Sequence, residues 1–363
     1  MLAVGCAVSN WIYFTYPLEV ECMEGSNWIE ALAFREGRNP YRDPGLAFIN
    51  MNHGPLDAPV KAVISRALPW LEPWEVIRLP SLFLPLLLVF SLRPGMKNLA
   101  PLPWRGAAAA GLTAYFVMQS TGNMVVNMGR SDALMLGLLA LLLPLGTCTF
   151  TAENRVRVPW AILGGAIAAA AFLENFRSAI VLPAFTLALA FDWPGDCFRP
   201  GRALLVWGGA ALLGAAALFA VVLGVVFRFD FATYYRYSLG FFLAPQGHGV
   251  SGLPRWRDLV DPFFENKVWL VLPIALLLAV ALRPRARATW VRAAVVGLPF
   301  VLFLGAYVSN HLGAAGGLHY FAPIVLLVLL VWRLASWNEA RDAGNAAVRL
   351  VMAILACDWR VVA

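Results

Sequence analysis

Long apolar runs separated by short polar connections dominate this chain. Each apolar run is close to the length of about 20 residues that a helix needs to cross a bilayer. The pattern therefore predicts an all-α, polytopic transmembrane bundle of about ten spans, with residues 1–363 as a single integral membrane domain. The predicted spans are 1–16, 74–92, 106–122, 132–150, 158–173, 176–192, 202–227, 267–282, 291–309 and 317–335.

Basic residues are concentrated in the connections that follow even-numbered spans, such as Arg93 and Lys97, or Arg155 and Arg157. Short loops rich in Lys and Arg stay in the cytoplasm. Both termini are therefore predicted to be cytoplasmic, and the two long loops, 17–73 and 228–266, are predicted on the periplasmic or exoplasmic side. The Ala/Leu/Arg-rich composition suggests a bacterial inner membrane.

The composition supports a membrane class: 60% of residues are hydrophobic, 13% are charged and the mean hydropathy is +0.70. A net charge of +7 could indicate a nucleic-acid partner. However, the arginines are already accounted for by the short loops, so no basic face is left for nucleic acid. The five cysteines form no CxxC motif, and only Cys22 falls on the predicted outer side, so no intrachain disulfide is expected.

The first outer loop is unusually long and acidic for a membrane chain. It carries eight carboxylates, namely Glu19, Glu21, Glu24, Glu30, Glu36, Asp43, Asp57 and Glu72. Residues 26–36 are expected to form a short helix that ends at Gly37. The segment from Pro55 to Pro69 has apolar residues at helical spacing, flanked by Lys61 and Arg66, which predicts an amphipathic helix lying on the membrane surface.

Glu24 and Glu21 are the candidate catalytic residues, because they follow the first span directly. A carboxylate at the membrane face could accept a proton from an acceptor hydroxyl, or hold a divalent cation. The alternative is that both are ordinary solvated loop acids. Nothing in the sequence requires a metal ion or another cofactor, and no pair of histidines has metal-ligand spacing.

Further polar residues recur at the predicted outer ends of later spans, where they could contact a substrate. Each also has a structural interpretation: a helix cap with its ion pair, a buried ion pair in a tight turn, or an interfacial anchor. The arginines among them are candidates for binding a phosphate group, since guanidinium binds phosphate in a bidentate manner. The candidate substrate-binding residues are Arg130, Asp132, Arg177, His53, Tyr41, His319 and Tyr320.

The order of these motifs resembles the GT-C superfamily of polytopic glycosyltransferases, in the branch with protein O-mannosyltransferases, aminoarabinose transferases and RgtA/B/C/D-like bacterial enzymes. Glu24 is followed by Gly37, Tyr41 and then His53-Gly54-Pro55-Leu56, as in the first outer loop of that family. The likeness continues in Arg78-Leu79-Pro80-Ser81, Gly129-Arg130-Ser131-Asp132-Ala133-Leu134 and Gly317-Leu318-His319-Tyr320-Phe321-Ala322-Pro323. It spans about residues 20–325.

The resemblance implies transfer of a hexosyl or pentosyl group from a polyprenyl-phosphate donor to a lipid, glycan or protein acceptor on the outer face. Glu24 would act as general base or position the acceptor, and Arg130 and Arg177 would stabilise the departing phosphate. The sequence departs from the family at two points. Met23 stands where the family has Asp, and Arg177 lies where a Lys is often found.

Two other functions remain open from the sequence. One is a transporter or flippase for an anionic amphipathic lipid, although no inverted repeat and no ionisable residue in an interrupted span is visible. The other is a polymerase or ligase of lipid-linked glycans, for which the arginines of loop 228–266 are the supporting feature.

Overall fold

The structure is a computed structural model of the 363-residue chain. It describes residues 2–17, 23–41, 54–93, 102–107, 109–110, 113, 131–151, 153–176, 178–192 and 197–236. Statements below on what is present or absent refer to these residues.

Helices form nearly all of the described structure. The longer ones are α1 (Leu2–Thr15), α2 (Met23–Arg35), α3 (Asp57–Ala67), α4 (Pro73–Leu92), α7 (Ser131–Thr149), α8 (Val158–Glu174), α9 (Ser178–Ala190) and α10 (Gly201–Phe227). The short elements are the 3-10 turn η2 (Leu102–Trp104), α11 (Phe231–Tyr234) and the strands β1 (Phe191–Asp192) and β2 (Cys197–Phe198). The strands pair antiparallel between α9 and α10, a small departure from the all-α prediction.

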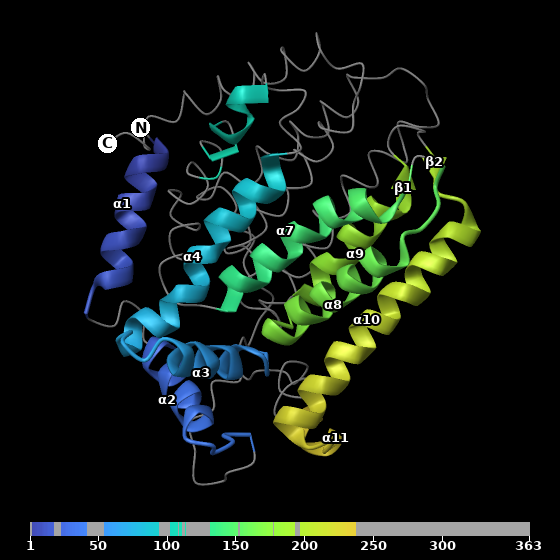
Figure 1. The fold of residues 1–363 in the computed structure, drawn as a ribbon. Coiled ribbons are helices and arrows are strands. Elements are labelled where there is room, and N and C mark those ends of the chain that lie inside the picture. The colour runs from blue at the N-terminus through green and yellow to red at the C-terminus, as the bar shows by residue number, and fades with distance from the viewer. Residues whose placement is uncertain are drawn as a thin grey trace, which may run out of the picture.

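The long helices run alternately between two ends of a bundle, which Figure 1 shows edge-on. At one end, called here the loop end, α2 and α3 meet the start of α4 and the last turns of α8 and α10. The opposite end carries Arg155 and Arg157 between α7 and α8, Arg199 between α9 and α10, and Arg202 in the first turn of α10. We call it the arginine end. The alternation agrees with the predicted order of spans over the described part of the chain.

The number of spans is not confirmed. Six predicted ranges correspond to α1, α4, α7, α8, α9 and α10. By length and composition, α4 and α10 could cross a membrane, and the apolar parts of α7 and α8 are shorter, within the described residues. Most of the predicted span 106–122, and all of the last three, lie outside those residues, as does loop 228–266 after residue 236.

Two glycines allow α8 and α10 to pack with their backbones in contact. A Cβ atom placed on Gly165 would lie 1.8 Å from the carbonyl oxygen of Ala211, and one on Gly214 would lie 1.9 Å from that of Ile162. No side chain fits at either position. Small residues at helix crossings are typical of membrane bundles, where close van der Waals packing replaces the hydrophobic driving force.

The helices α2 and α3 form a hairpin held by arginines. The Nη1 atom of Arg35 donates to Ser65 Oγ at 2.9 Å, and Nη2 of Arg66 donates to the carbonyl oxygens of Phe34 and Arg35. The sequence predicted that Lys61 and Arg66 flank the apolar residues of a surface helix, and the structure buries Lys61 on the inner face of α3. Asp57, Lys61 and Ser65 point inward and are buried, whereas Val63 is 65% exposed.

We expect Gly165→Ala to destabilise the bundle, because the added methyl group would overlap a backbone atom of α10 that cannot move without shifting the helix. Overpacking of this kind costs about 1–3 kcal/mol or more. Gly209→Ala is the matched control, since its Cβ meets nothing within 4 Å and alanine favours a helix. Thermal unfolding in detergent should show a lower midpoint for Gly165→Ala only. Equal midpoints would contradict the close crossing.

Candidate functional site at the loop end

Glu24 forms a buried, bidentate ion pair with Arg78. Glu24 lies in the first turn of α2, which begins three residues earlier than predicted, and Arg78 lies near the start of α4. Arg78 Nε donates to Glu24 Oε1 at 2.8 Å, and Nη2 donates to Oε2 at 2.7 Å. Glu24 is 2% exposed and Arg78 is 1% exposed. Glu24 is therefore not a solvated loop acid.

Arg78 also holds the end of α1. Its Nη1 atom donates to the carbonyl oxygens of Tyr13 and Tyr16, at 2.6 and 2.7 Å. The last carbonyls of a helix have no partner within the helix and must be satisfied from outside. One guanidinium thus joins α1, α2 and α4. Removing one partner of a buried pair leaves an uncompensated charge, which is far more costly than losing an exposed contact.

The segment Gly54-Pro55-Leu56 meets the last turn of α8 through its backbone. Gly54 N donates to the carbonyl oxygen of Glu174 at 2.8 Å, and Leu56 N donates to that of Leu173 at 3.1 Å. A Cβ on Gly54 would lie 1.9 Å from Leu173 O. Only glycine permits this approach. The Gly in this motif therefore docks the first outer loop onto the bundle.

Tyr41 anchors the same loop to α10. Its ring lies 5.2 Å from that of Phe227 and 6.0 Å from that of Phe34, between ring centroids. Tyr41 N donates to Asn39 Oδ1 at 3.0 Å, and Asn39 Nδ2 donates to the carbonyl oxygen of Val226. The segment after α2 is thus fixed against the last turn of α10.

Burial raises the pKa of the Tyr41 phenol well above its ordinary value, and the charges of Glu30, Asp57 and Glu174 raise it further. All three carboxylates are at most 3% exposed. A low-dielectric site disfavours a further negative charge. The phenol therefore stays neutral and can donate a hydrogen bond at physiological pH.

Lys61 supplies positive charge to this cluster of buried carboxylates. Its Nζ atom donates to Asp57 Oδ2 at 2.7 Å, one turn along α3, and both side chains are buried. The sequence prediction missed this pair, although the i, i+4 spacing of Asp57 and Lys61 was a visible signal. It also gave Arg78 no chemical role. The loop end thus contains four buried carboxylates with Lys61 and Arg78 among the described residues.

The structure places two of the predicted site residues, Glu24 and Tyr41, at the same end of the bundle. The backbone of Asp132 lies in the first turn of α7, but its side chain is not described. The remaining predictions fall outside the described residues: Glu21, His53, Arg130, Arg177, His319 and Tyr320. No group of three or more His, Cys, Asp or Glu side chains suited to a metal ion occurs in the described part of the chain.

Comparison with known proteins identifies solved structures of similar architecture. No protein-family model and no curated protein matches the chain. Among solved structures, ArnT from Cupriavidus metallidurans aligns in its apo state with a TM-score of 0.59 and 16% identity, and bound to undecaprenyl phosphate with 0.58 and 17%. An oligosaccharyltransferase from Archaeoglobus fulgidus, in complex with Zn and sulfate, aligns with 0.51 and 13%.

The chain shares its fold with these structures, in agreement with the fold expected from the resemblance to the GT-C superfamily. The alignments cover 98% of the chain for both ArnT structures and 99% for the oligosaccharyltransferase. They confirm the resemblance expected from the motifs, at the level of fold. The chain spans about three fifths of the length of ArnT, 62% and 63%, and 52% of the oligosaccharyltransferase. The chain therefore matches part of each of these proteins.

A double-mutant cycle tests the Glu24–Arg78 pair. We expect Glu24→Met and Arg78→Met each to lower the free energy of unfolding by about 3–5 kcal/mol, because each leaves a buried charge without its partner. The double substitution should cost less than the sum of the two. Denaturation of the purified variants in detergent measures all three. Strict additivity would show that the two side chains do not interact.

Alkaline pH tests the burial of Tyr41. In the unfolded chain a tyrosine loses its proton near pH 10, whereas in the folded protein its pKa is raised. Below pH 10 the tyrosine is protonated in both states and does not make stability depend on pH. As the pH rises from the unfolded pKa to the folded pKa, only the unfolded chain loses the proton, so the free energy of unfolding falls. We expect Tyr41→Phe to flatten this alkaline decline in unfolding temperature between about pH 9 and 11. Tyr235→Phe, at a position 56% exposed, is the control and should leave the decline unchanged.

Proposed function

We propose that this protein is a membrane glycosyltransferase that moves a hexosyl or pentosyl group from a polyprenyl-phosphate donor to an acceptor on the outer face. One observation carries the proposal: the buried Glu24–Arg78 pair lies at the loop end, at the motif position of the first outer loop, in a chain with the GT-C fold. The neighbour ArnT was solved with undecaprenyl phosphate bound, which supports a donor of this lipid class.

The reaction needs a proton acceptor and positive charge beside the leaving phosphate. A carboxylate receives the proton of the acceptor hydroxyl, whose oxygen attacks the anomeric carbon. The bond from that carbon to the phosphate oxygen breaks, and polyprenyl phosphate leaves with the negative charge. We assign the proton-accepting role to Glu24, with Glu21 and Asp132 as the alternatives, and the stabilisation of the phosphate to Arg130 and Arg177.

Arg78 supports this assignment by fixing Glu24. It donates one hydrogen bond to each of the two carboxylate oxygens. The carboxylate therefore has one rotamer before any substrate arrives, which is the preorganisation that catalysis requires. We propose Arg78 as a positioning residue. Tyr41, His53, His319 and Tyr320 are proposed to contact the sugar or the acceptor.

The proposed acceptor is a lipid, a glycan or a protein. The localisation that we propose is a bacterial inner membrane, with both termini cytoplasmic and the loop end outside. No metal ion is required by the proposal, and transfer in the presence of EDTA tests that point. Loss of transfer in EDTA with recovery on adding a divalent cation would assign one to the site.

The experiment is transfer of radiolabel from a panel of polyprenyl-phosphate sugars in proteoliposomes. We expect Glu24→Gln to lower the rate by about a hundredfold or more, as when a general base is removed. Glu24→Gln keeps the shape and one acceptor oxygen for Arg78, and its folding is checked by thermal unfolding.

The other outcomes assign other roles. Equal transfer by a folded Glu24→Gln protein would move the base to Glu21 or Asp132. Glu36→Gln changes an exposed acid directly after the end of α2; it is the matched control and should keep full transfer. Translocation of lipid without transfer from any donor would favour the flippase alternative and overturn the proposal.

A further inference from the structure

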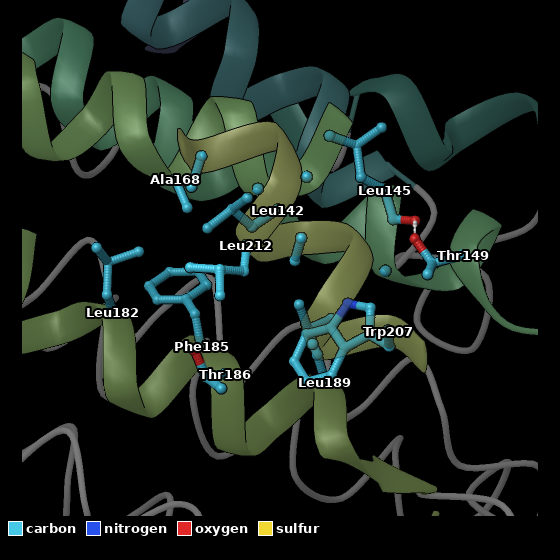
Figure 2. Close-up of a pocket in the computed structure, with 16 residues that line it drawn as sticks. Leu142, Leu145, Thr149, Ala168, Leu182, Phe185, Thr186, Leu189, Trp207 and Leu212 are labelled. Carbon is cyan, nitrogen blue, oxygen red and sulfur yellow. Dashed lines mark hydrogen bonds between the residues drawn. The ribbon is translucent and has the colours of Figure 1, made fainter. Parts of the chain in front are cut away.

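A mostly apolar cavity of about 320 Å³ lies among α7, α8, α9 and α10, away from the loop end. Figure 2 shows Leu142, Phe185, Leu189, Trp207 and Leu212 surrounding it. It has about twice the volume of an apolar cavity that holds one benzene molecule, about 150 Å³. The cavity is thus large enough for a stretch of hydrocarbon chain.

The cavity lies in the half of the bundle next to the arginine end. On α10 its lining runs from Trp207 to Ala215, within the first 15 of that helix's 27 residues. At a rise of about 1.5 Å per residue, this stretch lies about 10–20 Å from the start of α10. The catalytic site proposed above is at the other end. A ligand in this cavity would therefore not be the reacting part of the donor.

The cavity opens sideways onto an apolar surface. Among its lining residues, Leu212 is 70% exposed, and Gly208 and Thr186 are also exposed. Small residues on the facing helices create the space, including Gly164 and Ala168 on α8. At this depth of a membrane bundle the surrounding solvent is hydrocarbon, so an acyl chain can enter from the side without crossing a polar layer.

Arginines lie directly beyond the arginine-end limit of the cavity. The carbonyl oxygen of Thr149, a lining residue, accepts from Arg157 N at 2.8 Å. The carbonyl oxygen of Leu189, also a lining residue, accepts a hydrogen bond from Arg199 Nε at 3.2 Å.

The side chains of Arg155, Arg157 and Arg202 are exposed at the same end, and, of the acidic side chains described there, Glu153 is exposed. This excess of positive charge beside an apolar opening matches an anionic headgroup attached to an acyl chain.

We propose that this cavity binds one acyl chain of an anionic phospholipid, whose phosphate is held by the exposed arginines of the arginine end. In the predicted orientation this lipid belongs to the cytoplasmic leaflet. The inference does not depend on the proposed transferase activity. It assigns the cavity a structural lipid that fills the gap left by the small residues of α8 and α10.

Native mass spectrometry of the full-length protein in detergent tests the inference, with phosphatidylglycerol and phosphatidylcholine of identical acyl chains as probes. We expect one phosphatidylglycerol to be retained more strongly than phosphatidylcholine. Ala168→Phe, which fills the cavity, should weaken retention of both lipids about tenfold, equivalent to the loss of about two buried methylene groups. Ala217→Phe, on the exposed face of α10 outside the cavity, is the matched control and should retain lipid normally.

A second pair of measurements separates the chain from the headgroup. The double variant Arg157→Gln, Arg202→Gln should abolish the preference for phosphatidylglycerol while leaving phosphatidylcholine bound. A phosphatidylglycerol with a diazirine in its acyl chain should crosslink to residues 142–149, 182–189 or 207–215. If Ala168→Phe fails to fold, Thr186→Phe at the cavity edge replaces it. Equal retention of the two lipids, retention unaffected by the filled cavity, or crosslinks confined to other faces would overturn the proposal.

Discussion

The guanidinium of Arg78 is the interaction on which the loop end depends. It makes two bonds to Glu24 and two to the final carbonyls of α1, so that a single buried charge fixes three helices. Burying a charge is tolerable only when it is paired and fully hydrogen-bonded. The same condition that stabilises the loop end also gives Glu24 one orientation. The contacts that stabilise the fold at the loop end therefore also preorganise the proposed catalytic group.

The remaining contacts of the loop end bring the first outer loop onto the bundle at separate points. Gly54 lets the backbone bond to the end of α8, and Tyr41 packs on the end of α10. The buried pair of Asp57 and Lys61 turns the polar face of α3 inward. A loop fixed at several points holds its side chains in defined positions at this end of the bundle. This arrangement explains why the loop is long and acidic.

The two ends of the bundle differ in their charged residues and in whether these residues are buried. At the loop end, four carboxylates are buried together with Lys61 and Arg78 among the described residues. At the arginine end, exposed cations surround the turns between helices, and Arg199 lies over the ring of Phe150 at 4.0 Å from the ring centroid. Between the ends, glycines bring α8 and α10 into backbone contact and leave the cavity beside them.

The sequence by itself determined the positions of the described long helices, because apolar runs and basic loops are local signals that the membrane enforces directly. The family resemblance of the first-loop motif singled out Glu24, Gly54 and Tyr41, which the structure places at the loop end. Only the tertiary structure decided that Glu24 starts a helix and pairs with Arg78, 54 residues away, and that Lys61 is buried. Such pairings depend on how helices meet in space, and a pattern along one chain carries no information on which side chains face each other across a bundle.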